Sequence, residues 1–219
     1  MSKFSFDAHF NLPDGQCIIK KSICEFNSTE NDKERTLEFV FSDHRNDRLE
    51  VVLTQVVLLN EFYSTRLNSN KSGSKDGRKQ PMDVVAMAHH IIAWSDFSEY
   101  CMSEDSNKRF KAVEYIRKTS KEYQDAYSFA TKYCSWHNPN HYPICDSYSK
   151  GMLYYLGREG ILPCERFTQD ALKEYGYFCQ IYDMLINYLE NNCNKKIGCR
   201  ELDKFLWYYG KHNNIKIEN

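Results

Sequence analysis

Residues 128–148 read SFATKYCSWHNPNHYPICDSY, and this stretch decides how the rest of the chain is interpreted. Its first half carries small and aromatic residues at spacings of three and four, which predicts an amphipathic helix. That helix should end at Asn138-Pro139, because proline cannot continue an α-helix. Asp146 follows Pro143 at the place where a second helix should begin. The stretch therefore predicts two helices joined by a short loop, with an acid at the mouth of the second helix.

Helical periodicity also dominates the sequence on both sides of this stretch. Apolar residues recur at helical spacing over residues 49–63, 82–94, 110–116, 146–156, 175–189 and 202–209. The first 35 residues instead indicate an irregular or β N-terminal arm, because Pro13-Asp14-Gly15 is a turn signal. No strand alternation of useful length follows that arm. We therefore expect an all-α, mainly helical protein without internal repeats.

Charge and composition exclude several classes of protein. The net charge of -1 argues against a strongly basic protein that coats nucleic acid, although it permits one local basic face. Nine cysteines are spread singly, and no secretory leader is evident, so we expect reduced thiols and a cytoplasmic location. The longest apolar run, residues 51–59, is too short to cross a membrane.

Two groups of cysteine and histidine residues are candidates for metal sites. The spacing of Cys134, His137, His141 and Cys145 matches no structural zinc pattern. The candidate ligands of an iron–sulfur cluster are Cys164, Cys179, Cys193 and Cys199. Such a cluster is typically held by a closely spaced cysteine pair, and no two of these four are that close. We expect no metal and no cofactor.

The helix before Asp146 and the sequence PICDSY at residues 143–148 resemble the catalytic segment of helix-hairpin-helix DNA glycosylases. Members of this family, most nearly the 8-oxoguanine glycosylase branch, carry the similar pattern V-P-V-D-T-H. The resemblance covers about residues 45–156. It implies a two-lobed fold in one glycosylase-like domain, with that range as the core lobe and residues 1–44 and 157–219 as the second lobe. It also implies double-stranded DNA as the partner and Asp146 as the catalytic acid.

The chemistry of base excision explains why a carboxylate is needed at position 146. Cleavage of the bond between base and sugar builds positive charge on the sugar, as in other glycoside hydrolysis. A fixed carboxylate stabilises that cation and orients the attacking water. An aspartate at a helix N-terminus is also one of the best capping residues, and the two roles are compatible. Family members with lyase activity place a lysine where this chain has Ser128, so the resemblance implies a monofunctional enzyme that leaves an abasic site.

A second match supplies the expected DNA contacts. Residues 58–66, LLNEFYSTR, resemble the family segment L-L-S-x-Q-x-T-D, which pushes a side chain into the DNA stack. Tyr63, with Asn60 beside it, would fill the gap left by a flipped base, although Tyr63 also lies on the apolar stripe of its helix. Contacts to the DNA backbone are expected from Arg66, Lys71, Lys75, Arg78, Lys79, Ser128 and Lys132. Aromatic residues expected to stack on the extruded base are Trp94, Trp136, His137 and Tyr142.

One departure from the family pattern keeps an alternative open. The turn of the family hairpin usually carries G-x-G, whose backbone amides bind a phosphate, whereas residues 122–126 contain no glycine. The alternative is a non-catalytic helical module that binds DNA or a protein partner on a glycosylase-like scaffold. Small divergent glycosylases also resemble bacterial antiphage proteins, so modified cytosines of phage DNA are candidate substrates.

Overall fold

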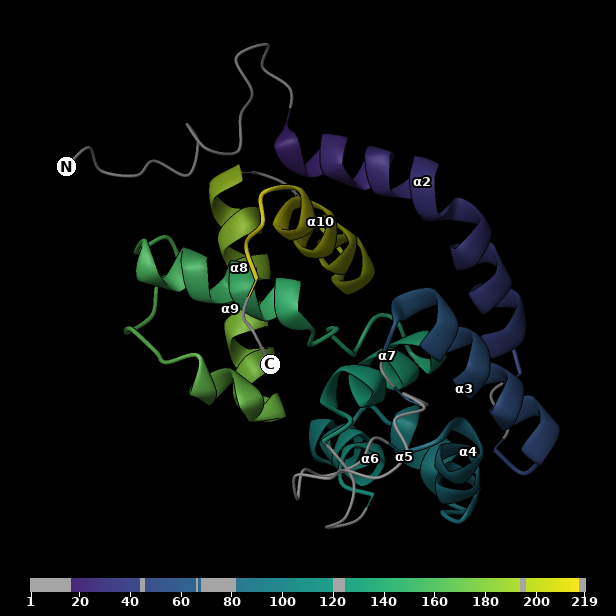
Figure 1. Ribbon diagram of the computed structural model, residues 1–219. Coiled ribbons are helices and arrows are strands. Elements are labelled where there is room, and N and C mark those ends of the chain that lie inside the picture. Colours follow the sequence, from purple (N-terminus) through teal and green to yellow (C-terminus); the bar gives the residue numbers. More distant parts are fainter. Residues whose placement is uncertain are drawn as a thin grey trace, which may run out of the picture. The chain divides into compact units, whose positions relative to one another are not determined.

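The computed structural model describes residues 17–43, 46–65, 67, 82–119, 125–193 and 196–216, with the side chains of residues 192 and 193 excepted. Within these ranges the chain forms nine α-helices and one 3-10 helix, with no β-strand (Figure 1). The expected all-α class is therefore confirmed. The chain divides into two compact units. We call residues 32–142 the central unit, and residues 1–31 together with 143–219 the terminal unit.

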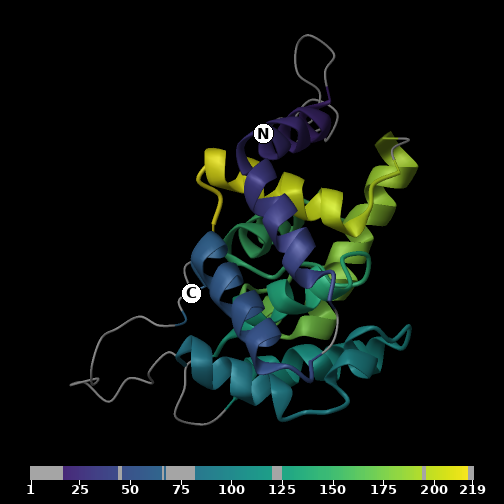
Figure 2. The same cartoon turned by 90° about the vertical axis from the view of Figure 1, so that its right-hand side faces the viewer.

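The first described helix corrects the expected irregular arm. Helix α2 (Ile18–Phe41), the long purple to blue helix of Figure 2, includes residues 18–35 of the region expected to be irregular or β, and residues 1–16 of that region lie outside the described residues. Its buried residues are spaced by multiples of a helical turn: Ile19, Ser22, Phe26, Glu34, Leu37 and Phe41. Two of these six are polar, and a polar run separates Phe26 from Leu37, so the apolar stripe is too sparse to recognise from the sequence.

The central unit contains the C-terminal part of α2 and five further helices. These are α3 (Leu49–Tyr63), α4 (Val84–Ile92), α5 (Phe97–Cys101), α6 (Ser106–Arg117) and α7 (Tyr127–His137). Helix α3 packs against α4 and α7, and α6 packs against α5 and α7. Asp83 and Asp105 begin α4 and α6, where each carboxylate accepts a backbone N–H of the first turn. All three helical patterns expected between residues 49 and 116 are present.

The terminal unit contains α8 (Ser147–Arg158), the 3-10 helix η1 (Asp170–Lys173), α9 (Tyr175–Cys193) and α10 (Cys199–His212). Helix α8 packs against α10. Gly210 lets α10 lie close to α8, and Gly151 lets the chain after α10 lie close to α8. A Cβ atom on Gly210 would lie 3.2 Å from Met152 of α8, and one on Gly151 would lie 2.7 Å from the backbone of Lys216. Gly160 ends α8 with a φ of 71°, a conformation that glycine adopts without strain.

The boundaries between the two units fall at different residues from the boundaries between the expected lobes. Their boundaries lie at residues 31/32 and 142/143, compared with the expected positions near 44/45 and 156/157. The later part of α2 joins the central unit, where the side-chain amide of Gln55 donates to the carbonyls of Val40 and Asp43. Residues 143–158 join the terminal unit because their contacts are with α9, η1 and α10. Asp146 therefore belongs to the terminal unit.

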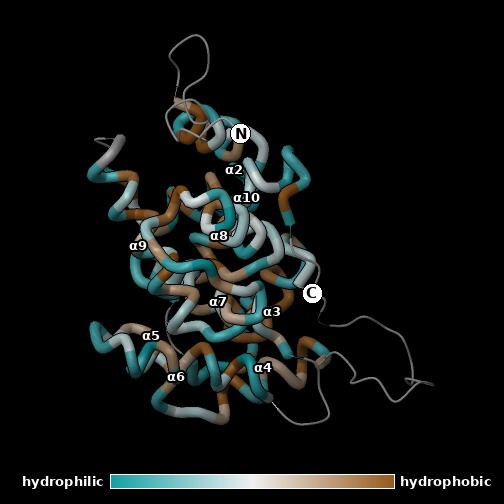
Figure 3. The backbone as a smooth tube through the Cα atoms, turned by 90° about the vertical axis from the view of Figure 1, so that its left-hand side faces the viewer, coloured by the Kyte–Doolittle hydropathy of each residue, from teal (hydrophilic) through white to brown (hydrophobic). Residues whose placement is uncertain are grey.

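The helices mix apolar and polar residues along their length. Figure 3 shows hydrophilic and hydrophobic colours alternating within the tubes rather than one continuous hydrophobic helix. Among the described residues, no helix has the length and apolar character needed to cross a membrane.

Candidate functional site

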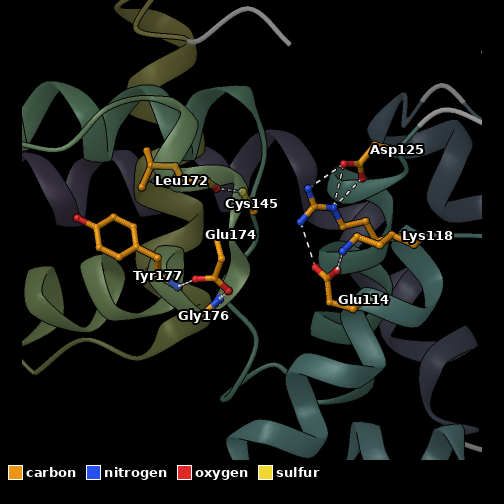
Figure 4. Close-up of polar contacts among 9 residues, drawn as sticks. Glu114, Lys118, Asp125, Cys145, Leu172, Glu174, Gly176 and Tyr177 are labelled. Carbon is orange, nitrogen blue, oxygen red and sulfur yellow. Dashed lines mark hydrogen bonds and ion pairs between the residues drawn. The ribbon is translucent and has the colours of Figure 1, made fainter.

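The segment that leads to Asp146 is anchored within the terminal unit by three contacts. The hydroxyl of Tyr175 donates to the carbonyl of Pro143 over 3.2 Å. The backbone N–H of Ile144 donates to a carboxyl oxygen of Asp203 over 3.0 Å. The thiol of Cys145 makes a weak contact to the carbonyl of Leu172 at 3.9 Å, which Figure 4 displays. Each of the three residues before Asp146 is therefore tied to η1, α9 or α10.

Asp146 is the N-cap of α8, as the capping interpretation of the sequence predicts. Its Oδ1 atom accepts the backbone N–H groups of Tyr148 at 3.0 Å and Ser149 at 2.9 Å. In return, the Ser149 hydroxyl accepts the N–H of Asp146 at 2.9 Å, which completes a capping box. The side chain is 6% exposed. The carboxylate thus has a fixed orientation at the positive end of a helix dipole, as stabilisation of a developing cation requires.

A second acid, Asp203 on α10, lies beside this segment. Its side chain is 5% exposed, and its Oδ1 atom lies within hydrogen-bonding distance of both the Ile144 N–H and the Tyr182 hydroxyl. Burial raises the pKa of the Asp203 carboxyl to about 7, and the negative charge of Asp146 adds to this effect. Nearby Arg200 and the two hydrogen bonds act in the opposite direction.

Sequence reasoning missed Asp203, although a signal was present. Asp203 follows Leu202 and precedes Leu206 on the apolar stripe of the last helix, and both leucines are fully buried. A single acid on the buried face of an amphipathic helix is rare unless it has partners, since a buried charge is costly.

Helices α6 and α7 lie on either side of the stretch 122–126 that the resemblance assigns to the hairpin turn, and they pack against each other. The loop between them spans residues 118–126, of which 120–124 lie outside the described residues, so the phosphate-binding role of the turn is not described. Arg117 closes the described ends of this loop. Arg117 is only 8% exposed, and its guanidinium donates two hydrogen bonds from Nε and Nη2 to Asp125 at 2.8 Å. The carbonyl of Arg117 accepts the N–H of Ala126 at 3.3 Å. Figure 4 shows Asp125 at this loop together with Glu114, which also pairs with Arg117.

Within the central unit, Lys132 of α7 is a buried basic residue that lies beside the end of α3. Lys132 is 5% exposed. Its Nζ atom donates to the Ser128 hydroxyl over 3.1 Å and lies 5.3 Å from the centre of the Tyr63 ring, within cation–π distance. The Tyr63 hydroxyl in turn donates to the carboxylate of Glu34 on α2 over 2.8 Å. Three of the expected DNA-contacting residues, Tyr63, Ser128 and Lys132, are thus brought together.

Asn60, by contrast, organises the turn that follows α3. Its Oδ1 atom accepts the Leu67 N–H and the Thr65 hydroxyl at 2.9 and 2.8 Å, and its Nδ2 atom donates to the Leu67 carbonyl at 3.0 Å. These bonds stabilise the chain where Ser64 adopts a left-handed conformation with a φ of 48°. The basic residues expected just beyond, Arg66, Lys71, Lys75, Arg78 and Lys79, lie outside the described residues.

The four residues expected to stack on a base lie in the central unit, but they contact different neighbours. Trp136 packs near Tyr63 and Phe41, with ring centres 6.5 and 6.0 Å apart. His137 lies deeper, 4.9 Å from Tyr133 and 5.0 Å from Phe41.

The other two belong to a different part of that unit. Tyr142 is fully buried, and its hydroxyl donates to the Cys101 carbonyl over 3.0 Å. Burial raises the pKa of the Tyr142 phenol far above its ordinary value. Trp94 packs instead with Tyr100 and Tyr115, at 4.8 and 4.7 Å. Trp136 is therefore the one of the four whose ring neighbours Tyr63.

No group of three or more histidine, cysteine or acidic side chains suited to a metal ion occurs within the described ranges. Among the cysteines with a described side chain, none forms a disulfide bond.

Comparison with known proteins places the chain in a family. No solved structure matches it. An uncharacterized protein of Haemophilus influenzae is 29% identical over 171 residues, which cover 78% of this chain and 72% of that protein. A family model named HI_0787_N, described as an N-terminal domain, matches residues 18–141, and its end adjoins the end of the central unit at residue 142. Neither description names an activity. Because the matched residues are more than half of the 219-residue chain, the protein belongs to the HI_0787_N family.

Proposed function

We propose that the protein is a DNA glycosylase that hydrolyses the bond between a flipped, damaged or modified base and its sugar. The observation that carries this proposal is the order of three features. A helical hairpin, α6–α7, is followed by a nine-residue connection, 138–146, and then by a carboxylate held at the N-terminus of α8. This is the order that the resemblance to helix-hairpin-helix glycosylases implies.

Asp146 has the properties that the proposed reaction needs from its acid. Two backbone N–H groups hold Oδ1, so the carboxylate requires no reorganisation when positive charge develops on the sugar. In our proposal it stabilises that charge and orients the attacking water. Capping and catalysis are compatible because the capping box holds the carboxylate in one orientation.

Water is the proposed nucleophile, so the product is an intact abasic site. The position at which related lyases carry their lysine holds Ser128, whose hydroxyl cannot form a Schiff base. Lys132, one turn later, is buried against Ser128 and Tyr63. In this proposal Lys132 binds DNA through its charge. Borohydride treatment during turnover should therefore trap no covalent complex between protein and DNA, whereas a trapped complex would make Lys132 the first residue to test.

A panel of duplexes tests the proposal directly. Duplexes with undamaged, oxidised, alkylated, hydroxymethylated-cytosine or glucosylated-cytosine bases are incubated with the protein, and abasic sites are then cleaved with alkali. We expect strand breaks on at least one duplex. Asp146→Asn should lower the rate at least a hundredfold while DNA binding, measured by fluorescence anisotropy, is unchanged.

The chain offers a matched control for that substitution. Asp105 caps α6 by the same side-chain chemistry, since its Oδ1 atom accepts the N–H of Asn107 at 2.9 Å. Asp105→Asn should leave the rate unchanged. An equal loss in both variants would mean that the effect is one of capping, and it would count against a catalytic role for Asp146.

One observation favours a second candidate, a non-catalytic DNA- or protein-binding module. Asp146 is 6% exposed, and its N-cap role alone accounts for its position. On this alternative, the protein binds DNA or a protein partner but produces no abasic site on any duplex of the panel, and Asp146→Asn changes nothing.

The proposed setting is the cytoplasm of a bacterial cell, in defence against phage whose DNA carries modified cytosines. The odd number of singly spaced cysteines supports a reducing compartment. Cells that express the protein should then restrict phage with glucosylated or hydroxymethylated cytosine, and cells that express Asp146→Asn should not.

A further inference from the structure

Asp203 is connected to Asp146 by a continuous set of hydrogen bonds within the terminal unit. Asp203 accepts the N–H of Ile144, and the carbonyl of the same Ile144 accepts the Ser149 hydroxyl at 2.7 Å. The Ser149 hydroxyl also accepts the N–H of Asp146, and the Ser149 N–H donates to the Asp146 carboxylate. Ile144 is therefore held at both its N–H and its carbonyl, and the Ile144 peptide links the two acids.

The hydrogen bonds of Asp203 and Tyr182 indicate whether the Asp203 carboxyl group is protonated. The Tyr182 hydroxyl lies 2.8 Å from the Cys199 carbonyl and 3.0 Å from Oδ1 of Asp203, but it has one proton to donate. If that proton goes to the closer carbonyl, the contact with Asp203 requires a proton on the carboxyl group. In addition, Oδ2 of Asp203 is buried without a hydrogen-bond partner. A buried unpartnered oxygen costs less on a neutral carboxyl than on a carboxylate.

We propose that Asp203 is a positioning residue for Asp146 and that it holds the segment 143–146 in its protonated form. This inference rests on the glycosylase function proposed above. Protonated at Oδ1, Asp203 donates to the Tyr182 oxygen while the same atom accepts the Ile144 N–H, and Asp146 is left as the charged carboxylate of the pair. Loss of the proton places a second negative charge in the same packed region. The segment then loosens to admit water, and Asp146 loses its fixed orientation.

The surroundings of Asp203 agree with a transition near neutral pH. Titratable groups interact with Asp203 from three helices of the terminal unit: Arg200 and Cys199 on α10, Tyr182 on α9, and Asp146 at the start of α8. Arg200 is the cation among these groups and opposes the effect of burial. The carboxyl is nevertheless raised to a pKa of about 7. The switch from the positioning form to the loosened form should therefore be centred near neutrality.

Two substitutions separate the protonated group from the charged one. Asp203→Asn keeps an Oδ1 atom that accepts the Ile144 N–H, and its NH2 group takes the place of Oδ2, but the side chain cannot ionise. Asp203→Ala removes the acceptor. Asp170→Asn, an exposed acid of the same unit, is the control. On a duplex that the wild type cleaves, kcat of the wild type should fall at least fivefold between pH 6 and pH 8.5.

The variants should change that profile in different ways. In Asp203→Asn, kcat should stay within threefold of the wild-type value at pH 6 and remain constant to pH 8.5. In Asp203→Ala, kcat should fall at least tenfold at pH 6 while KM changes less than twofold. Asp170→Asn should follow the wild-type profile. A wild-type profile that is flat, or one that Asp203→Asn reproduces, would overturn the protonated role.

Amide hydrogen exchange supplies a readout that does not depend on activity. Protection of the Ile144 N–H, corrected for intrinsic exchange, should fall above pH 7 in the wild type and stay constant in Asp203→Asn. Asp203→Asn keeps the test decisive if Asp203→Ala does not fold. Unchanged protection across pH in the wild type would overturn the positioning role, whatever the activity. If protection behaves as expected but no duplex is cleaved, the glycosylase proposal fails, and Asp203 then holds the segment for another purpose.

Discussion

The hydroxyl of Tyr133 on α7 donates a 2.7 Å hydrogen bond to the side-chain oxygen of Gln55 on α3, and both side chains are fully buried. The amide of Gln55 meanwhile donates to two carbonyls at the end of α2. One buried side chain thus links three helices of the central unit. Because every polar group in this contact is removed from water, the contact specifies the arrangement of these helices more strictly than apolar packing alone would.

Tyr133→Phe should destabilise the protein, because it leaves the Gln55 oxygen buried without its donor. We expect a loss of about 1–3 kcal/mol in the free energy of unfolding, measured by urea denaturation. Tyr154→Phe on α8, where the ring is only partly buried, should cost less than about 0.5 kcal/mol and serves as the control. A loss in Tyr133→Phe no larger than in the control would contradict the proposed strength of the buried contact.

Capping and catalysis at Asp146 can be separated by stability measurements. Asparagine is about as good an N-cap as aspartate, whereas alanine removes the acceptor of the Tyr148 and Ser149 N–H groups. We expect Asp146→Ala to lower the free energy of unfolding by about 1 kcal/mol and Asp146→Asn to lower it by about half of that or less. Thermal denaturation of the two variants checks this order. If Asp146→Asn proved the less stable variant, its loss of activity would no longer be evidence for chemistry.

The described ends of the loop between α6 and α7 are joined by the ion pair of Arg117 and Asp125. Arg117 is nearly buried, whereas the side chain of Asp125 is 52% exposed, so solvent screens the pair from one side. Asp125→Asn should therefore cost only about 1 kcal/mol, while Arg117→Ala, which also removes packing on Tyr127, should cost about 2–3 kcal/mol.

Chemical denaturation in low and in high salt checks both values. The effect of Asp125→Asn should shrink with added salt, because its interaction is partly exposed. The effect of Arg117→Ala should largely persist, because stacking on Tyr127 is not screened. Salt-independent losses of equal size in both variants would show that the loop is not held by charge.

The elements that the sequence predicts well are those with dense apolar stripes. In α3, fully buried Val52, Val56 and Leu59 recur at helical spacing, and that regularity is visible without a structure. Helix α2 shows the opposite case. Two polar residues, Ser22 and Glu34, occupy buried positions of its stripe, so local hydrophobicity carries no helical signal there.

The candidate site was predictable only in its local part. Asp146 follows from the proline before it and the helix after it, because a cap depends on neighbours in sequence. Asp203 reaches the Asp146 segment from a helix that begins more than 50 residues later in the chain, and Tyr182 contacts Asp203, so no sequence pattern links these residues to Asp146. Asn60 shows a related limit. It lies in the segment expected to contact DNA, but its hydrogen bonds to Thr65 and Leu67 form only when the chain after α3 turns back.

The pH dependence of stability tests the charge state of Asp203 without any substrate. Its pKa is about 7 in the folded protein, compared with the ordinary value of 3.8 for an aspartate. Between these values the folded protein holds a proton that the unfolded chain has released, so stability falls as the pH rises from about 4 to about 7 and then levels off. The contribution of this one group is on the order of 4 kcal/mol at most.

Asp203→Asn isolates that contribution, because every other titrating group is common to the variant and the wild type. The free energy of unfolding of the variant minus that of the wild type should increase steadily between pH 4 and pH 7 and then remain constant. Urea denaturation at half-unit pH intervals measures it, and Asp170→Asn should show no such rise, since its pKa is lowered by Lys173 rather than raised. A constant difference for Asp203→Asn over the whole range would mean that Asp203 is charged throughout, and that α10 holds the Asp146 segment with a carboxylate instead.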